Sequence, residues 1–231
     1  MGAESAITID GPAASGKSTV GRALAERLGY LFFDTGVMYR AVTLAVLRHG
    51  IDPGDEAAVT ALAESVEINV EPPTQRDGRL YTVLLDSEDV TWVIRAGEID
   101  AHVSQVSAYR AVRAAMTRQQ RRIGVRGRVV MAGRDIGTVV LPEAGVKFYL
   151  DATPEARAHR RWLEFKARGI DQPYEEILAA MRRRDEIDST REVSPLRPAP
   201  DAIVIDSTDM ELTAVIDTVY DYIVKAQGID G

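Results

Sequence analysis

The sequence predicts an α/β fold in which a five-stranded parallel sheet carries helices on both faces. Three observations support it: five short apolar segments have the length of buried strands, helical patterns separate most of them, and most end at an aspartate or next to a glycine. Ligands of such sheets bind beyond the carboxyl ends of the strands. The predicted strands are residues 6–10, 30–34, 128–132, 146–151 and 202–206.

The segment after the first predicted strand has the form G-x-x-x-x-G-K-S from Gly11 to Ser18, which is a phosphate-binding loop. A helix is predicted at residues 19–28, because apolar residues recur at every fourth position and Gly29 follows as a stop. In this arrangement backbone N–H groups and the helix dipole converge on a phosphate. Lys17 adds a positive charge at the β- and γ-phosphates, and the Ser18 hydroxyl can ligate Mg²⁺. The loop therefore predicts binding of a nucleoside triphosphate.

A long stretch, residues 35–127, separates the second and third predicted strands. It contains three further strand-like runs, at residues 66–70, 80–86 and 89–93, with turn-forming residues between the first two. We therefore expect a small antiparallel meander with its own minor core, inserted between strands of the main sheet.

Composition limits the class of protein. The 231 residues are 45% apolar and 27% charged, as in ordinary globular proteins, and the net charge of −7 argues against a nucleic-acid-binding surface. The absence of cysteine excludes disulfides, thiolate catalysis and cysteine-ligated zinc. The sequence shows neither a signal peptide nor a membrane-spanning run, so we expect a cytoplasmic protein with no membrane partner. Nothing in the sequence requires an oligomer, and a monomer is expected.

Two further clusters follow predicted strands. After the second strand, the sequence D-T-G-V-M-Y-R places Thr35 where it can cap a helix and Arg40 where it can reach an anion. A surface salt bridge is the alternative for Arg40. After the third strand, the sequence G-R-D-I-G-T places Arg134 and Asp135 between two glycines. A turn alone needs the glycines but not the charged pair, so a ligand role is favoured.

Arginines gather in the helical region after the fourth strand, at residues 157–168 and 182–191. The i, i+4, i+7 spacing of Arg184, Asp188 and Arg191 predicts that one helix face presents all three. A solvated charged face is the alternative. Because the chain is acidic overall, arginines near a phosphate loop favour phosphoryl transfer. A phosphate acceptor would need no general base, in agreement with the absence of an obvious one.

In this order, the motifs make the chain resemble the bacterial cytidylate kinases, within the nucleoside monophosphate kinase group of P-loop kinases. The resemblance covers residues 7–222 and implies transfer of the γ-phosphoryl group of ATP to CMP or dCMP, giving ADP and CDP or dCDP, with Mg²⁺. The segments that carry it are residues 11–19, 34–40, 103–106, 112–113, 133–140, 184–191, 194–196 and 206–208.

The resemblance also implies roles for single residues. Those implied to bind ATP are Gly11, Pro12, Ala13, Ala14, Ser15, Gly16, Lys17, Ser18 and Thr19, with Ser18 on the metal. Those implied to bind CMP are Thr35, Arg40, Ser104, Arg113, Arg134, Asp135, Arg184, Asp188 and Arg191. The catalytic residues implied are Lys17, Arg134, Arg184 and Arg160.

Within the implied CMP site, each group has a part of the ligand. The acceptor phosphate is assigned to Arg40, Arg134 and Arg184, and the sugar to Ser104 and Asp188. Thr35 and Asp135 are assigned to the cytosine amino group, and Arg113 and Arg191 to its N3 and O2 atoms. A carboxylate facing the amino group favours cytosine over uracil, which presents an acceptor there.

The resemblance further implies a division of the chain. The core comprises residues 1–34, 128–153 and 172–231, and residues 35–127 bind the monophosphate, with the meander at about 66–105. Residues 154–171 form a helical lid that closes over ATP and carries Arg160 to the triphosphate.

One departure from the family concerns the metal. Many relatives carry an acidic residue just before the Gly-Arg-Asp sequence, where this chain has Ala132. Asp10, Asp34 and Asp135 are the alternatives for orienting the water molecules on Mg²⁺.

Three rival functions remain in view. A GTP-driven switch needs an Asn-Lys-x-Asp motif, and Asn69, the only asparagine, is followed by Val70. A kinase for a non-nucleotide acceptor would not need the pair of Asp135 and Arg191. A non-catalytic nucleotide-binding module would have no use for Lys17 and the arginines.

Overall fold

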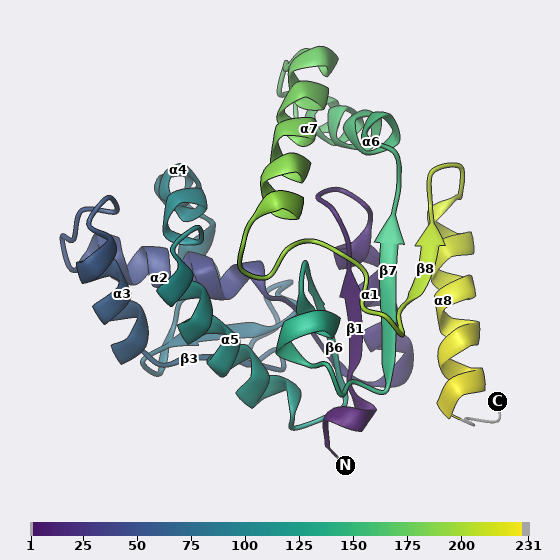
Figure 1. Cartoon of the computed structure of the whole chain (residues 1–231), viewed down its shortest axis with the longest axis horizontal. Coiled ribbons are helices and arrows are strands. Elements are labelled where there is room, and N and C mark those ends of the chain that lie inside the picture. Colours follow the sequence, from purple (N-terminus) through teal and green to yellow (C-terminus); the bar gives the residue numbers. More distant parts are fainter. Residues whose placement is uncertain (1, 228–231) are drawn as a thin grey trace.

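The computed structural model describes residues 2–227, and it has an α/β architecture (Figure 1). Five parallel strands form one sheet in the order β2-β6-β1-β7-β8. All five predicted strands are confirmed, with ends shifted by at most a residue. Their bounds are β1 Ile7–Asp10, β2 Leu31–Asp34, β6 Val129–Gly133, β7 Val146–Asp151 and β8 Ile203–Asp206.

The sheet is covered on both faces, as predicted. On one face lies α1 (Lys17–Leu28), where a Cβ on Gly21 would stand 3.4 Å from Ile9 of β1. On the other face lies η3, the π-helical turn Ile136–Val140, where a Cβ on Gly137 would stand 3.0 Å from the Thr8 hydroxyl. Neighbouring residues of a strand point to opposite faces, so α1 and η3 lie on opposite sides of β1. The helix α8 (Leu212–Gln227) packs beside α1.

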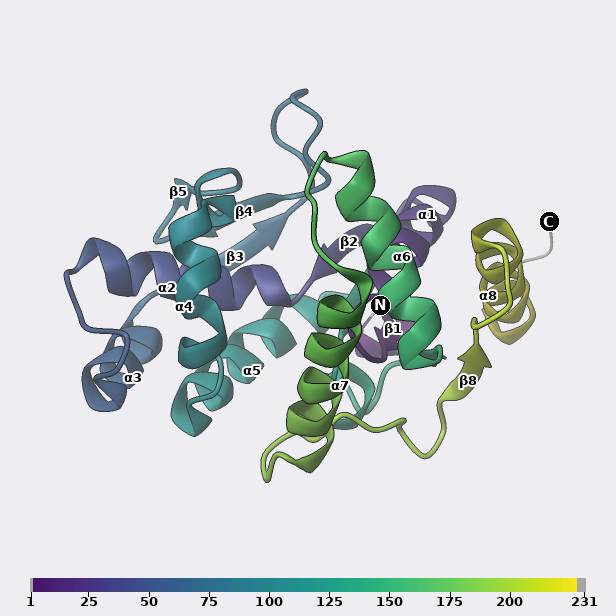
Figure 2. The same cartoon turned by 90° about the horizontal axis from the view of Figure 1, so that it is seen from above.

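The insertion between β2 and β6 forms a separate lobe (Figures 1 and 2). Its three-stranded antiparallel sheet has the order β3-β4-β5 and confirms the predicted meander. The prediction of a third strand at residues 89–93 is wrong beyond residue 89, because β5 comprises only Glu88–Asp89. The Asp89 carboxylate accepts hydrogen bonds from the Thr91 amide and hydroxyl, which turns the chain away after two paired residues. The lobe contains α2 Gly36–Arg48, α3 Glu56–Ser65, β3 Ile68–Glu71, β4 Thr82–Leu85, β5 Glu88–Asp89, η2 Val93–Arg95, α4 Gly97–Val106 and α5 Arg110–Gly124.

A helical hairpin, α6 (Pro154–Ala167) and α7 (Tyr174–Thr190), lies over the carboxyl ends of the strands (Figure 1). The first helix begins where it does because the Thr153 hydroxyl caps the Ala156 amide and Pro154 occupies the first turn. The hairpin has its own small core, separate from the main one, formed by Ala158, Ile177, Leu178 and Met181.

The predicted division into core, monophosphate-binding region and lid stays a prediction. The limit between lid and core at residues 171–172 falls between two helices that pack together. Residues 1 and 228–231, assigned to the core, lie outside the described part of the chain. A short 3₁₀ helix, η1 (Ala3–Ser5), precedes β1. No helix among residues 2–227 is long and apolar enough to cross a membrane.

Candidate active site

The loop from Gly11 to Ser18 leaves β1 and enters α1 through unusual backbone angles. Gly11 has φ +146°, and a Cβ there would stand 2.1 Å from the Leu150 carbonyl oxygen of β7, so the neighbouring strand allows only glycine. Ala14 has φ +59° and Gly16 has φ +95°. The helix begins at Lys17, earlier than predicted, so its N-terminal amides open directly onto the loop.

The Lys17 side chain lies folded across this loop. Its ammonium donates to the Pro12 carbonyl oxygen and lies 3.4 Å from the Ser15 hydroxyl, and the residue is 6% exposed. Burial, together with repulsion by Arg134, lowers the pKa of Lys17 to about 7. An anion in the loop would favour the charged form, so this lysine is suited to respond to a phosphate.

Ser18, the last residue of the phosphate loop, contacts Asp34, the last residue of β2. The Ser18 hydroxyl donates to Asp34 Oδ2 at 2.9 Å, and Asp34 Oδ1 accepts from the Gly36 amide at 2.9 Å. Oxygen donors of this kind suit Mg²⁺. Of the three alternative carboxylates, Asp10 is hydrogen-bonded to backbone amides and Asp135 to an arginine. Asp34 is therefore the one that shares a hydrogen bond with the predicted metal ligand.

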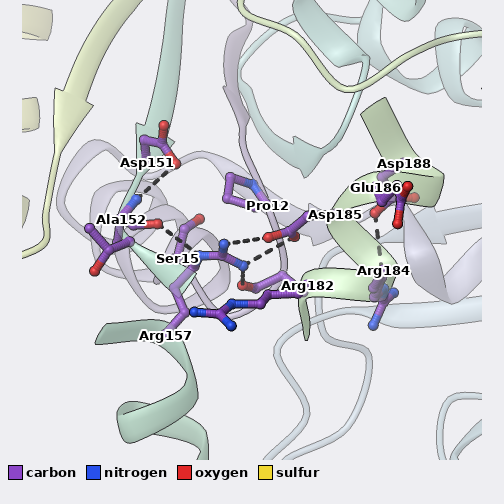
Figure 3. A network of polar contacts seen from close by, with 12 residues as sticks. Pro12, Ser15, Asp151, Ala152, Arg157, Arg182, Arg184, Asp185, Glu186 and Asp188 are labelled. Carbon is purple, nitrogen blue, oxygen red and sulfur yellow. Dashed lines mark hydrogen bonds and ion pairs between the residues drawn. The ribbon is translucent and has the colours of Figure 1, made fainter. Parts of the chain in front are cut away.

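Three arginines surround the carboxylate of Asp188. Asp188 of α7 lies 2.7 Å from Arg134 Nε, 3.3 Å from Arg191 Nη1 and 4.0 Å from Arg184 Nε. Figure 3 shows Arg184 and Asp188 on neighbouring turns of the helix. The prediction that Arg191 shares the helix face is wrong, since α7 ends at Thr190 and Arg191 is extended, with its Nε bonded to the Ser194 carbonyl. Its side chain still turns back to Asp188.

A second, buried ion pair lies beside this cluster. Arg113 of α5 donates from Nη2 to Asp135 Oδ2 at 3.0 Å, and both side chains are 9% exposed. The guanidinium also lies over the Tyr39 ring, 5.5 Å from its centroid. Thr35 is also buried, and its hydroxyl donates a hydrogen bond to the Ala132 carbonyl at 3.1 Å. The sequence does not predict the contact of Tyr39 with Arg113, because a tyrosine within an apolar helix gives no indication of which side chain packs on its ring.

Arg40 and Ser104 lie at the insertion lobe. Arg40 donates to the Ile94 carbonyl at 3.1 Å and pairs with Asp100 of α4, so in this structure it forms the salt bridge weighed as the alternative. Ser104 is exposed on the same helix, α4. The contacts of Arg40 are thus with the lobe rather than with the Asp188 cluster.

On α6, the arginine that contacts the phosphate loop is Arg157 rather than Arg160. Arg157 is 3% exposed at its side chain, donates to the Ala13 carbonyl at 3.1 Å and the Ala152 carbonyl at 2.9 Å, and pairs with Asp185 of α7 (Figure 3). Arg160 instead donates to the hydroxyl and carbonyl oxygens of Ser207. Only the packing of α6 on α7 brings Arg157 to Asp185, so no local sequence pattern identifies this contact.

A cavity of about 180 Å³ lies between α6 and α7 and reaches the phosphate loop at Ala13. Ala13 of the loop, Arg161 of α6 and Arg184 of α7 all line it. Two arginine side chains therefore line an open space next to the loop. Among residues 2–227 there is no group of three or more histidine, aspartate or glutamate side chains that could hold a metal on its own. A metal here would depend on the ligand for most of its coordination.

A parallel sheet, a phosphate loop between its first strand and first helix, and arginines facing that loop from a helical hairpin define a P-loop kinase. Sequence comparisons give the particular family. The family model described as "Cytidylate kinase" matches residues 7–225. The chain belongs to this family and is a phosphotransferase of the nucleoside monophosphate kinase type, which confirms the resemblance seen in the sequence.

Individual relatives agree with the family model. The chain is 56% identical to the cytidylate kinase of Chloroflexus aggregans over 86% of this chain and 85% of that protein. It is 53% identical to the cytidylate kinase of Roseiflexus castenholzii, over 94% and 92% of the two chains. It is 48% identical to the cytidylate kinase of Limosilactobacillus reuteri over 96% of each.

Proposed function

We propose that this kinase transfers the γ-phosphoryl group of ATP to CMP or dCMP, giving ADP and CDP or dCDP, with Mg²⁺. The observation that carries the proposal is the meeting, at one edge of the sheet, of the phosphate loop with the Arg113–Asp135 pair and the arginines around Asp188. The phosphate loop suits a triphosphate, the Arg113–Asp135 pair suits a base, and Arg134 and Arg184 beside Asp188 suit a phosphate.

The donor half comprises Gly11 to Thr19. Backbone amides of the loop and the N-terminus of α1 bind the phosphates, and Lys17 supplies a charge at the β- and γ-phosphates. Mg²⁺ would be held at Ser18, with Asp34 hydrogen-bonding its water molecules; when bound, it neutralises charge on the phosphate oxygens. Support for Asp34 comes from its hydrogen bond with Ser18.

The acceptor half separates phosphate from base. Arg40, Arg134 and Arg184 would bind the acceptor phosphate, whose charge can take the place of Asp188 or Asp100 as the partner of their guanidinium groups. This exchange explains why the arginines gather around carboxylates in the free protein, where an unpaired cluster of cations would repel itself.

The cytosine ring would bind at the buried ion pair. Asp135 and Thr35 accept hydrogen bonds from its amino group, while Arg113 and Arg191 donate to N3 and O2. Ser104 and Asp188 would contact the sugar. The Nε of Arg113 and the Nη2 of Arg191 are buried without a hydrogen-bond partner among residues 2–227, so donors are available for a ligand.

Catalysis would rest on charge and position. The acceptor phosphate oxygen is already anionic, so it attacks the γ-phosphorus without a general base. Lys17, Arg134 and Arg184 stabilise the charge that spreads over the transferred oxygens. Arg160 would join them when the lid closes, because its present partners are neutral oxygens of Ser207, which a triphosphate can replace.

The reaction is tested by incubating the protein with Mg²⁺, CMP and ATP labelled at the γ-phosphate. The proposal predicts ADP and labelled CDP in equal amounts, with the label on the β-phosphate, and no turnover when Mg²⁺ is chelated. Hydrolysis of ATP without labelled CDP would contradict it. We also propose that the protein is a monomer and acts in the cytoplasm, and analytical ultracentrifugation of the purified protein tests the first of these points.

A further inference from the structure

The Asp10 carboxylate is buried at the junction between the donor and acceptor halves. Asp10 is the last residue of β1, directly before Gly11 of the phosphate loop, and is 3% exposed. Its Oδ1 accepts from the Ile136 amide at 2.8 Å, and its Oδ2 accepts from the Gly137 amide at 2.7 Å. Within the described residues it forms no ion pair. A buried carboxylate without a cation is unfavourable unless hydrogen bonds hold it, so these amides decide where it lies.

The two amides belong to the first residues of η3, which has Asp135 at its N-cap position. An aspartate at this position ordinarily accepts a hydrogen bond from the second or third amide of the helix, here that of Gly137 or Thr138, with its own side chain. Asp135 makes no capping hydrogen bond, and its carboxylate pairs with Arg113 instead. Asp10 therefore caps η3 from a neighbouring strand and leaves the Asp135 carboxylate free for another partner.

We infer that Asp10 is a positioning residue for acceptor recognition, because its capping of η3 holds the Asp135 carboxylate toward Arg113 and joins the Arg134–Asp135 turn to the strand that carries the phosphate loop. The inference rests on the proposed function, in which Asp135 accepts a hydrogen bond from the cytosine amino group. Burial raises the pKa of Asp10 to about 6, so at neutral pH it stays mostly ionised and both oxygens accept.

Gly137 makes the close approach to Asp10 possible. A Cβ at this position would stand 3.3 Å from Asp10 Oδ2 and 3.0 Å from the Thr8 hydroxyl. The φ angle of Gly137 lies outside the left-handed region, so alanine would meet no backbone strain. Gly137→Ala therefore acts by crowding Thr8 and Asp10 on the sheet. It disturbs the hydrogen bond between Asp10 and the Gly137 amide by a change in η3 rather than in β1.

The test is the Asp10→Asn variant, assayed with CMP and UMP. Asparagine has the same shape but offers one accepting oxygen, so one amide of η3 loses its partner. The Asp135 carboxylate can then turn to that amide and away from Arg113. We expect the ratio of kcat/KM for CMP to that for UMP to fall about tenfold, while KM for ATP changes less than about twofold. An unchanged ratio would overturn the inference.

Thr8→Val is the matched control. Thr8 is fully buried, two residues earlier on the same face of β1, and its hydroxyl has no hydrogen-bond partner among residues 2–227. Valine keeps the shape, so we expect the wild-type ratio. A double-mutant cycle separates a positioning role from a general loss of stability. If Asp10 acts through Asp135, then Asp10→Asn changes the ratio little in an Asp135→Asn background; full additivity would contradict the inference.

Two further outcomes distinguish this inference from the proposed function. If Asp135→Asn alone leaves the CMP-to-UMP ratio unchanged, the proposed base recognition fails and the inference fails with it. If Asp135→Asn lowers the ratio but Asp10→Asn does not, only the role of Asp10 is overturned. Should Asp10→Asn fail to fold, Gly137→Ala tests the same contact; a lowered ratio supports the inference and a wild-type ratio contradicts it.

Discussion

The donor and acceptor halves of this site are built in different ways. The donor half is one continuous segment, and its shape comes from backbone angles such as those of Gly11 and Gly16 and from the start of α1. The acceptor half consists of side chains from several separate elements, which ion pairs with Asp135 and Asp188 hold together. A backbone site is formed before its ligand arrives, whereas a network of ion pairs must exchange partners when a phosphate enters.

The comparison predicts that damage to the donor half mainly reduces turnover. Lys17→Ala removes the charge that the loop directs at the β- and γ-phosphates, and we expect kcat to fall about 10³-fold. The shape of the loop depends on its glycines, so the variant should keep its far-ultraviolet circular dichroism spectrum. Steady-state kinetics with saturating CMP provide the measurement. A kcat within about tenfold of wild type would mean that another group carries this charge.

Damage to the acceptor half should instead change substrate affinity and selectivity. Arg191→Ala removes a donor proposed for the cytosine ring, and we expect KM for CMP to rise about 10- to 100-fold with little change in KM for ATP. Arg197→Ala, which replaces an exposed arginine between α7 and β8, serves as the control. Equal increases in both KM values would place Arg191 outside the base site.

The contact between the halves depends on Arg157, which ties α6 to α7 and to the loop at Ala13. Arg157→Met leaves Asp185 without its partner, and we expect the free energy of unfolding to fall by about 3 kcal/mol. Arg182→Met, which breaks the exposed pair with Glu155, should cost less than about 1 kcal/mol. Urea denaturation of both variants makes the comparison. Equal losses would indicate that the Arg157 contacts contribute no more than a surface pair.

The smallest effect is a proton that binds together with the nucleotide. The pKa of Lys17 is about 7 in the free protein, so at pH 8 its side chain is neutral in most molecules. A triphosphate favours the charged form and raises this pKa, so binding at pH 8 should take up nearly one proton, and affinity should fall as pH rises above about 7. Calorimetric titration in buffers of different ionisation enthalpy measures the uptake. Lys17→Met should abolish it; uptake that persists in this variant would assign the proton elsewhere.

The difference between the halves also explains what could be predicted from the sequence. The phosphate loop is a local pattern, so Gly11 to Ser18 and the flanking strand and helix were identified from their own residues. The five strands were equally accessible, because each is a short apolar run with a polar end. The end of the meander could not be predicted in this way, because the Asp89–Thr91 hydrogen bonds turn the chain although the residues that follow favour a strand.

The acceptor half shows where sequence patterns stop. Helical spacing joined Arg184, Asp188 and Arg191, yet the helix ends before Arg191, and the three meet through side-chain reach rather than a shared face. Tertiary packing alone brings Arg157 to Asp185, far along the chain. Likewise, nothing in the sequence indicates that Asp10 rather than Asp135 caps η3.

The most direct test of the account is kcat/KM for the wild-type protein with CMP, dCMP, UMP, AMP and GMP as alternative acceptors, at saturating ATP and Mg²⁺. The account predicts a strong preference for CMP and dCMP, because Asp135, Arg113 and Arg191 together match the edge of cytosine. Similar values for all five acceptors, or activity on none of them while ATP still binds, would contradict the assignment of the acceptor half and leave only the phosphate loop in place.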